Sequence, residues 1–154
     1  SEAERLLWRV DARVGSDENV TLLLGQMMQY RQQELYIKSF YEDRLRENKH
    51  WEQVWEDYVG WLKRDGFYDY AIETSMESVR ENPDAIRLNI QLVLLETEYG
   101  NVENAIALAT AMTDVFQNDP SPWRLLARAL DKSGDYIGAM KAQSKAAELQ
   151  RDAN

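Results

Sequence analysis

A period of 34 residues is the feature that most restricts how this chain can fold, because repeats of this length mark stacked architectures. Three glycines stand 34 residues apart, at Gly66, Gly100 and Gly134. Five residues after each glycine comes an alanine, at Ala71, Ala105 and Ala139. Glycine can end a helix in the left-handed conformation, and a small alanine leaves room for a neighbouring helix. Each period therefore predicts two antiparallel helices joined by a turn at the glycine.

Apolar residues at helical spacing precede each of these turns, as a helix with one buried face requires. The second and last periods share the pattern, in Trp55, Tyr58 and Leu62 and, 68 residues later, in Trp123, Leu126 and Leu130. The earliest period is weaker, since Gln32 stands at the glycine position and Ile37 at the alanine position. Its assignment depends on the register of the other three.

The register predicts an all-α chain: one domain over residues 1–154, an α-solenoid of antiparallel helix pairs with about nine helices. The expected repeats are 18–51, 52–85, 86–119 and 120–153. Residues 2–14 carry Ala3, Leu7 and Val10 at second-helix positions. We interpret this segment as a lone helix, the second half of a preceding repeat, which protects one end of the solenoid.

The same positions carry a resemblance to a known family. The last period has Trp123, Leu126, Ala127, Leu130, Gly134, Tyr136, Ala139 and Ala146, and the second has Trp55, Tyr58, Leu62, Gly66, Tyr68, Ala71 and Pro83. This pattern resembles the tetratricopeptide repeat (TPR) family over nearly the whole chain. The third period departs from it, because Asn89 and Glu96 stand where apolar residues are usual. The resemblance implies a concave groove, lined by the first helix of each pair, that binds protein segments; it does not identify the partner.

The composition of the chain argues against several classes of function. The net charge of −9 disfavours binding to nucleic acid, which needs a basic surface. There is no cysteine, no signal peptide and no run of 18 apolar residues, so we expect no disulfide and no membrane insertion. The compartment stays open between cytoplasmic and periplasmic or lumenal. Because the sequence starts at Ser1, we expect a processed or shortened chain, and a preceding segment that tethers it stays an open alternative.

No catalytic apparatus is visible in the sequence, so we predict no enzyme activity, no metal and no cofactor. His50 is the single histidine, at an Asn-Lys-His turn that we expect to be solvated. There is no glycine-rich phosphate loop, no His-Glu-x-x-His motif and no nucleophile elbow. The tryptophans at helical spacing are predicted to be core residues: Trp8, Trp51, Trp55, Trp61 and Trp123.

The candidate partner-binding residues lie in the third and fourth repeats. Apolar residues surround most of the segment 88–95, so this helix is either buried by its neighbours or meets a partner. The family register places Ile90 and Leu94 on the groove. The same register places three basic side chains beside the groove: Arg87, Arg124 and Arg128. A weaker basic group stands at the groove positions of the second repeat, in Lys63 and Arg64. Arginine can hold a carboxylate through two hydrogen bonds; the alternative is solvated arginines or pairing with acids of the chain.

These observations favour a non-catalytic adaptor that binds a partner peptide or helix in the concave groove. One alternative is the soluble part of a longer membrane-anchored or multidomain assembly protein that acts by oligomerisation, so a homo-oligomer stays open. Another is an RNA-processing scaffold of the half-a-TPR family, whose spacing Trp55-x-x-Tyr58-x-x-Trp61 resembles. Binding of chaperone tails is not implied, because Leu22 and Gln26 stand where that TPR class carries Lys and Asn.

Overall fold

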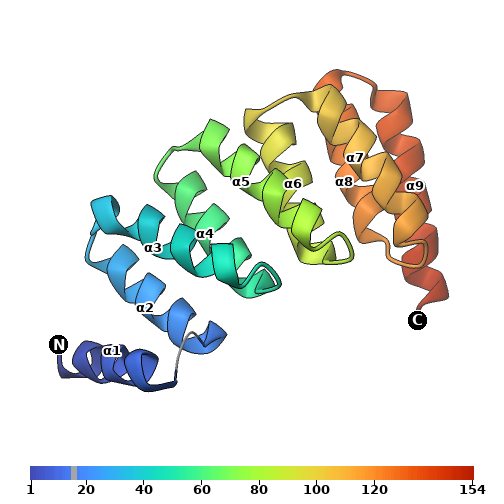
Figure 1. The fold of residues 1–154 in the computed structure, drawn as a ribbon. Helices are drawn as coiled ribbons and strands as arrows, with labels where there is room; N and C mark the ends of the chain where they lie inside the picture. The colour runs from blue at the N-terminus through green and yellow to red at the C-terminus, as the bar shows by residue number, and fades with distance from the viewer. Residues whose placement is uncertain (15–16) are drawn as a thin grey trace.

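The protein is an all-helical solenoid in the part of the chain that the structure describes. This computed structural model describes residues 1–14 and 17–154, and none of them lies in a strand. Nine helices follow one another in these ranges: α1 (Glu2–Val14), α2 (Glu18–Tyr30), α3 (Glu34–Glu47), α4 (Glu52–Arg64), α5 (Tyr68–Glu81), α6 (Ile86–Tyr99), α7 (Val102–Val115), α8 (Ser121–Ser133) and α9 (Tyr136–Asp152). They succeed each other in chain order, and the two termini lie at opposite ends (Figure 1). The predicted α-solenoid is confirmed.

The curvature of the solenoid follows from which helices touch. Each helix contacts the next along the chain, and the first helices of successive pairs also contact one another: α2 with α4, α4 with α6 and α6 with α8. The backbones of the second helices of successive pairs, α3, α5, α7 and α9, do not come this close to one another, although side chains such as Tyr70 and Glu42 bridge α5 and α3. The row of first helices therefore lies on the inner, concave side, and the second helices form the outer side.

Two hydrophobic clusters make up the core. The first runs from α2 to α6 and contains Tyr41, Tyr58 and the three tryptophans at positions 51, 55 and 61. The second runs from α6 to α9 and contains Ala105, Leu125 and Leu126. Helix α6 belongs to both, because Leu88 and Leu95 lie in the first cluster and Val93 lies in the second.

Three of the four turns within pairs share one backbone geometry. Gly66 and Gly134 are left-handed, with φ of +83° and +90°, and Gln32 adopts φ +55° at the same register. In each case the next residue donates its N–H to the carbonyl five residues before it, at 2.9 Å for Phe67 to Leu62 and 3.2 Å for Gln33 to Met28. This is the Schellman arrangement, which satisfies carbonyls at a helix end. Gln32 makes the turn although it is not a glycine.

The turn at Gly100 is different, and the predicted left-handed conformation is wrong there. Gly100 has φ −119°. The following Asn101 N–H bonds at 2.9 Å to the side chain of Glu96, where the other turns use the backbone carbonyl. Glu96 is 5% exposed, at a position that is apolar in the other repeats. A Cβ at position 100 would lie 2.3 Å from Glu96 Oε2 and 2.9 Å from Ile72 Cδ1, so a larger residue would displace the Glu96 carboxylate that accepts from Asn101.

The end repeats depart from two expectations about burial. Ala71 and Ala105 are fully buried as predicted, but Ala139 is only half-buried. Trp8 is 40% exposed and is not a core residue, whereas the expected core positions Trp51, Trp55 and Trp61 are buried. The reason is the same at both ends: no further helix of the described chain covers α9 or α1.

Helix α1 is attached to the first pair by polar and aromatic contacts. Leu7 and Val10 are half-buried, and α1 contacts α2. Asp11 forms two hydrogen bonds with the Arg44 guanidinium of α3, at 2.7 and 2.5 Å. Trp8 packs edge-on against Phe40, with ring centroids 5.9 Å apart. A two-bond pair of largely buried charges fixes orientation, so α1 has a defined position at the end of the solenoid.

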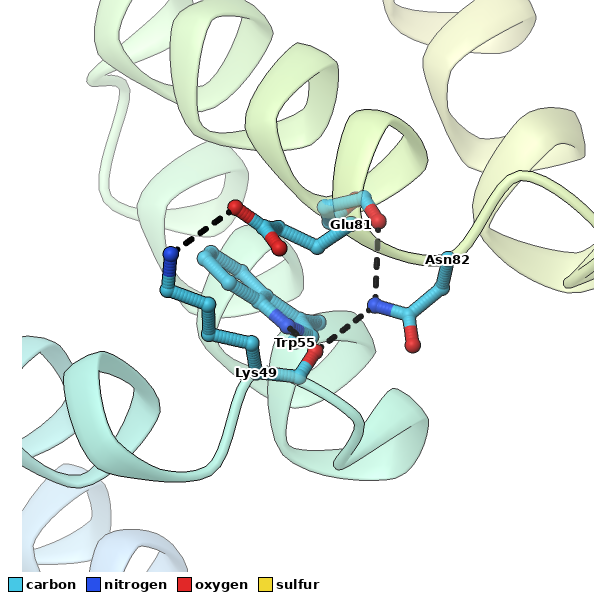
Figure 2. Close-up of polar contacts among 5 residues, drawn as sticks. Lys49, Trp55, Glu81 and Asn82 are labelled. Atoms are coloured by element: carbon cyan, nitrogen blue, oxygen red, sulfur yellow. Dashed lines mark hydrogen bonds and ion pairs between the residues drawn. The ribbon is translucent and has the colours of Figure 1, made fainter.

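The loops between repeats are joined by the carbonyl of Lys49. Figure 2 shows this oxygen accepting from the Trp55 indole and from the Asn82 side chain, each at 2.8 Å. The Lys49 ammonium also reaches Glu81, 3.1 Å away. One loop thereby binds both the helix that follows it and the end of α5, which fixes the spacing of the first two repeats.

Replacing Gln32 with glycine should stabilise the protein. A left-handed conformation costs a non-glycine residue roughly 1–2 kcal/mol, and glycine avoids that cost. Glycine also has more conformational freedom in the unfolded chain, which cancels part of the stabilisation. We expect Gln32→Gly to raise the free energy of unfolding by about 1 kcal/mol in urea titrations. Gln33→Gly is the matched control, because Gln33 has φ −83°. It should lower stability, and a gain there would contradict the explanation.

Enlarging Ala105 should destabilise the second cluster. Ala105 has no exposed surface, so Ala105→Leu must displace its neighbours. We expect a loss of roughly 1–3 kcal/mol, measured by thermal or denaturant unfolding. Ala147→Leu on the exposed side of α9 is the control and should change stability by less than about 0.5 kcal/mol. Equal stability of the two variants would show that the helix register is misassigned.

Candidate functional site

The inner row of first helices bounds an open groove of about 520 Å³ between α2, α4 and α6. Its lining is mainly polar, with a few apolar side chains such as Leu22 and Leu88. The charged lining residues are Glu52, Glu56, Asp57, Arg64 and Arg87. Such a surface offers hydrogen bonds and charges of both signs to a bound segment.

Two of the predicted groove arginines pair with acids on the preceding first helix. Arg87 Nη2 lies 2.6 Å from Glu56 Oε1, between α6 and α4. Arg128 Nη2 lies 2.7 Å from Glu98 Oε1, between α8 and α6. The arginines are largely exposed and the two acids are partly exposed, and ion pairs near the surface contribute little to stability. They can therefore exchange an internal carboxylate for an external one at small cost.

The other predicted basic residues have different surroundings. Arg64 donates to Gln29 Oε1 at 2.7 Å, and Arg124 donates to Gln150 Oε1 at 3.0 Å. Lys63 is exposed. Arg64 and Arg87 line the groove described above, whereas Arg124 and Arg128 line a second groove of about 480 Å³ between α8 and α9. The expected basic residues are thus divided between two grooves.

Ile90 and Leu94 lie between these grooves on α6. Both are half-buried and pack against the second hydrophobic cluster. Leu88, Leu92 and Leu95 of the same helix are buried. Most of the apolar surface of α6 is therefore covered by neighbouring helices, and Ile90 and Leu94 keep a partly accessible edge.

A hydrogen-bonded network under the groove was missed at the sequence level. The Tyr41 hydroxyl donates to Asp57 Oδ2, and Gln29 Nε2 donates to both, at 2.8 Å to Tyr41 and 3.1 Å to Asp57. Tyr41 fits only because Gly25 lies against it: a Cβ at position 25 would come within 2.2 Å of the hydroxyl oxygen. A glycine inside a helical pattern signals such a close approach. The sequence does not indicate that Asp57 makes a buried contact, because Glu56 and Asp57 together resemble the solvated face of a helix.

The buried phenols are held in their protonated form. Burial, with the nearby Asp57 carboxylate, raises the pKa of Tyr41 well above its usual value of 10. Burial, with the charge of Glu42, raises the pKa of Tyr58 in the same direction. Tyr58 donates to Glu42 Oε1 at 3.1 Å, and Tyr70 donates to the same oxygen. Each carboxylate is thus bound by neutral donors that hold α2, α3, α4 and α5 together.

Neither a metal site nor a membrane span is found in the described part of the chain. No group of three or more His, Cys, Asp or Glu side chains in residues 1–14 and 17–154 is placed to hold a metal ion. No helix in these ranges is both long and apolar enough to cross a membrane. His50 is exposed, beside the ring of Trp51.

Comparisons with known proteins identify the fold. No family model matches the sequence, and no curated protein sequence matches it. Solved structures do match, among them MamA MSR-1 C2, with 19% identity, a TM-score of 0.70 and coverage of 99% of this chain and 88% of that one. MamA 41-end from Desulfovibrio magneticus RS-1 has 16% identity, a TM-score of 0.73 and coverage of 98% and 85%. A further crystal structure of MamA has 14% identity, a TM-score of 0.75 and coverage of 98% and 88%. MamA is a helical TPR-like solenoid, so the fold of this chain is of the TPR type.

Removing the Tyr41 hydroxyl should destabilise the protein at neutral pH. Tyr41→Phe leaves the Asp57 carboxylate with one hydrogen-bond donor fewer in a partly buried place, which costs roughly 1–3 kcal/mol. The wild type should also lose stability as the pH rises above about 10, because phenols ionise there in the unfolded chain but not in the folded one. The variant should lose less over the same range, since it has one raised phenol fewer.

Tyr30→Phe is the control, because Tyr30 is 91% exposed. Its free energy of unfolding and the pH dependence of that free energy should match the wild type. Denaturant titrations at several pH values between about 7 and 11, the range in which free phenols begin to ionise, measure both quantities. Equal stability of Tyr41→Phe and Tyr30→Phe at neutral pH would contradict the role assigned to the network.

Proposed function

We propose that this chain is a non-catalytic scaffold of the TPR family whose inner surface binds an extended segment or a helix of a partner protein. The fold supports the proposal, because the row of neighbouring first helices leaves one open surface along the inner side of the solenoid. The residues proposed for contact are Arg87, Ile90, Leu94, Arg124 and Arg128, with Lys63 and Arg64 at the margin.

The observation that carries this proposal is an unsatisfied acceptor in the inner groove. Gln91 lines the groove, and its Nε2 donates to the backbone carbonyl of Glu56 at 3.0 Å. Its buried Oε1 has no hydrogen-bond partner among the described residues. Leaving a buried acceptor unpaired costs roughly 1–3 kcal/mol. Rotation of the Gln91 side chain into the groove would bring this oxygen within reach of the backbone N–H of a bound peptide.

The charges beside Gln91 indicate which segment fits. Arg87, one helical turn earlier on α6, pairs with Glu56, an acid that is itself partly exposed. A carboxylate of the partner can replace Glu56 there and accept two hydrogen bonds. The accessible edge of Ile90 and Leu94 offers an apolar contact further along the same helix. The expected ligand is therefore a segment with an apolar residue and at least one acidic residue or terminal carboxylate.

The RNA-processing alternative has less support. Its signature residues Trp55, Tyr58 and Trp61 are all buried, so they offer no stacking surface to bases. The net charge of −9 also opposes the approach of a phosphate backbone.

The proposal predicts that neutralising groove arginines weakens partner binding and leaves the fold intact. The partner is first isolated by affinity capture on the purified chain and identified by mass spectrometry. Its affinity for Arg87→Ala and for the double variant Arg124→Ala, Arg128→Ala is then measured by calorimetry. We expect a loss of about five- to tenfold in each, because each variant removes charge-assisted hydrogen bonds to the partner's carboxylate. Binding of the wild type should weaken with added salt.

Lys141→Ala on the outer side of α9 is the control and should bind as the wild type does. Ile90→Ala tests the apolar contact, with thermal melting to separate lost binding from lost stability. If a captured partner binds Arg87→Ala and the double variant with unchanged affinity, the inner surface is not its binding site.

A further inference from the structure

The groove between α8 and α9, the end groove, lies where no further helix of the described chain covers the solenoid (Figure 1). It has a volume of about 480 Å³. Small and apolar side chains form much of its lining: Ala127, Ala139, Tyr136 and Met140. Tyr136 and Met140 are 66% and 71% exposed. Large apolar side chains that are exposed together mark a candidate interaction surface.

Each earlier pair of helices has its equivalent groove filled by the next first helix. Helix α4 contacts both α2 and α3, α6 contacts both α4 and α5, and α8 contacts both α6 and α7. One and two repeats before Met140 stand Ile106 and Ile72, which are half-buried against the hydrophobic clusters. One repeat before Ala127 stands Val93, which is buried. The end groove is therefore built from positions that receive a helix elsewhere in the solenoid.

Arg124 stands at a position from which a side chain reaches the following first helix. Two repeats earlier the residue is Glu56, whose carboxylate lies 2.6 Å from Arg87 of α6. Arg124 is exposed and donates to the neutral side chain of Gln150 at 3.0 Å, and no acid of the described chain forms an ion pair with it. Its charge is opposite to that of Glu56. A helix in the end groove therefore meets Arg124 best with an acid at the position of Arg87.

Asp131 occupies a second position of this kind. Three repeats earlier the residue is Gln29, whose Nε2 donates to Asp57 of α4 at 3.1 Å. The position of Asp57 corresponds in α6 to Gln91, one helical turn after Arg87. Asp131 is exposed, and its carboxylate has no ion-pair partner in the described residues. It therefore favours a basic side chain on the docked helix, one turn after the acid.

Arg128, the other charged residue of the end groove, is paired with the preceding first helix. Its guanidinium donates to Glu98 Oε1 at 2.7 and 3.0 Å. Lys132 Nζ lies 3.9 Å from the second oxygen of the same carboxylate. Arg124 and Asp131 are therefore the charged lining residues whose ionic interactions are not supplied by the described chain.

We propose that the end groove binds an amphipathic helix of a partner protein, which packs as a further first helix with an acid facing Arg124 and a basic residue one turn later facing Asp131. An acid and a base in this order, four residues apart, also stabilise an isolated helix. The apolar face of the ligand lies on Tyr136, Met140 and the alanines. The equivalent face of α6 consists of buried leucines: Leu88, Leu92 and Leu95.

This inference rests on the proposed function, because Arg124 belongs to the residues proposed there for contact, and it adds the class of partner that the end groove takes. Burial of the apolar face supplies most of the affinity, as anchors in a pocket usually do. The two charges set the register of the docked helix and exclude helices with the opposite order of charges.

Two synthetic peptides with the sequence of α6, Ile86–Tyr99, serve as probes. The matched peptide carries Arg87→Glu and Gln91→Lys, and the reversed peptide carries Arg87→Lys and Gln91→Glu, so their compositions are identical. Alanine, a strong helix former, replaces in both peptides the three residues that pack toward the second cluster: Ile90, Val93 and Leu94. Circular dichroism compares the helix content of the two peptides.

The matched peptide should bind the wild type at least about fivefold tighter than the reversed peptide in fluorescence anisotropy titrations, because the reversed peptide makes two like-charge contacts. The double variant Arg124→Glu, Asp131→Lys should invert this preference, which a difference in helix content between the peptides cannot do. Both substituted residues are exposed, so the variant should keep the stability of the wild type.

Met140→Gln tests the apolar contact and should weaken binding of both peptides about fivefold, since it replaces an exposed apolar side chain by a polar one of similar length. Lys141→Ala, at an exposed position that does not line the end groove, is the control and should bind as the wild type does. Thermal melting checks that both variants are folded.

The proposal is overturned if the matched peptide fails to bind the wild type at up to about 1 mM, if the two peptides bind it equally, or if the double variant keeps the wild-type preference. Arg87→Ala in the protein separates this inference from the proposed function, because Arg87 lines the inner groove and not the end groove. A captured partner that loses affinity for Arg87→Ala, while neither peptide binds, supports the proposed function and removes this inference. Peptide binding with the expected preference, beside a captured partner that is insensitive to Arg87→Ala, supports the end groove and removes the inner one.

Discussion

Burial of α6 between two hydrophobic clusters is the constraint on which the solenoid depends. In a stacked fold each repeat touches only its neighbours, so stability is a sum of local interfaces. Here Leu88 and Leu95 complete the first cluster and Val93 enters the second. A helix with polar residues on one of those sides would divide the chain into two weakly joined halves. The apolar character of α6 around most of its circumference is explained by this double burial, and a partner is not needed to explain it.

The sequence allowed the fold to be predicted because the constraints of the repeat are local. A left-handed turn residue and a small packing residue identify each pair wherever they occur, and the structure has turns at all four expected positions. The exceptions arise where a different group performs the same task. Gln32 makes the left-handed turn without being glycine, since its hydrogen bonds outweigh the conformational cost. Glu96 replaces a backbone carbonyl with a side chain, so the turn beside it no longer needs a positive φ.

The candidate site could be predicted only in part, for a different physical reason. Register indicates which side of a helix a residue occupies, and Arg87 and Arg128 do bridge successive first helices. It does not give the distance between one first helix and the next, so their pairing with Glu56 and Glu98 could not be derived. The same limit hid the contact of Tyr41 with Asp57, which lie 16 residues apart in different repeats. Ends were also hard to predict, since Trp8 has core chemistry but no helix to cover it.

The inner and outer sides of the solenoid are under different constraints, and this explains why they can carry separate interactions. Inner positions face the neighbouring first helix, so a charge placed there is met by a partner within the chain, as Glu98 meets Arg128. Outer positions have fewer neighbours, because the backbones of successive second helices lie further apart and only some side chains, such as Tyr70 and Glu42, bridge them. Their composition is therefore free to change from one repeat to the next, from arginine in α1 to glutamate in α5 and alanine in α7. Few of these outer side chains have a partner in the chain, Glu81 with Lys49 being one of them, so the charge of the outer side can vary between repeats while the core stays the same.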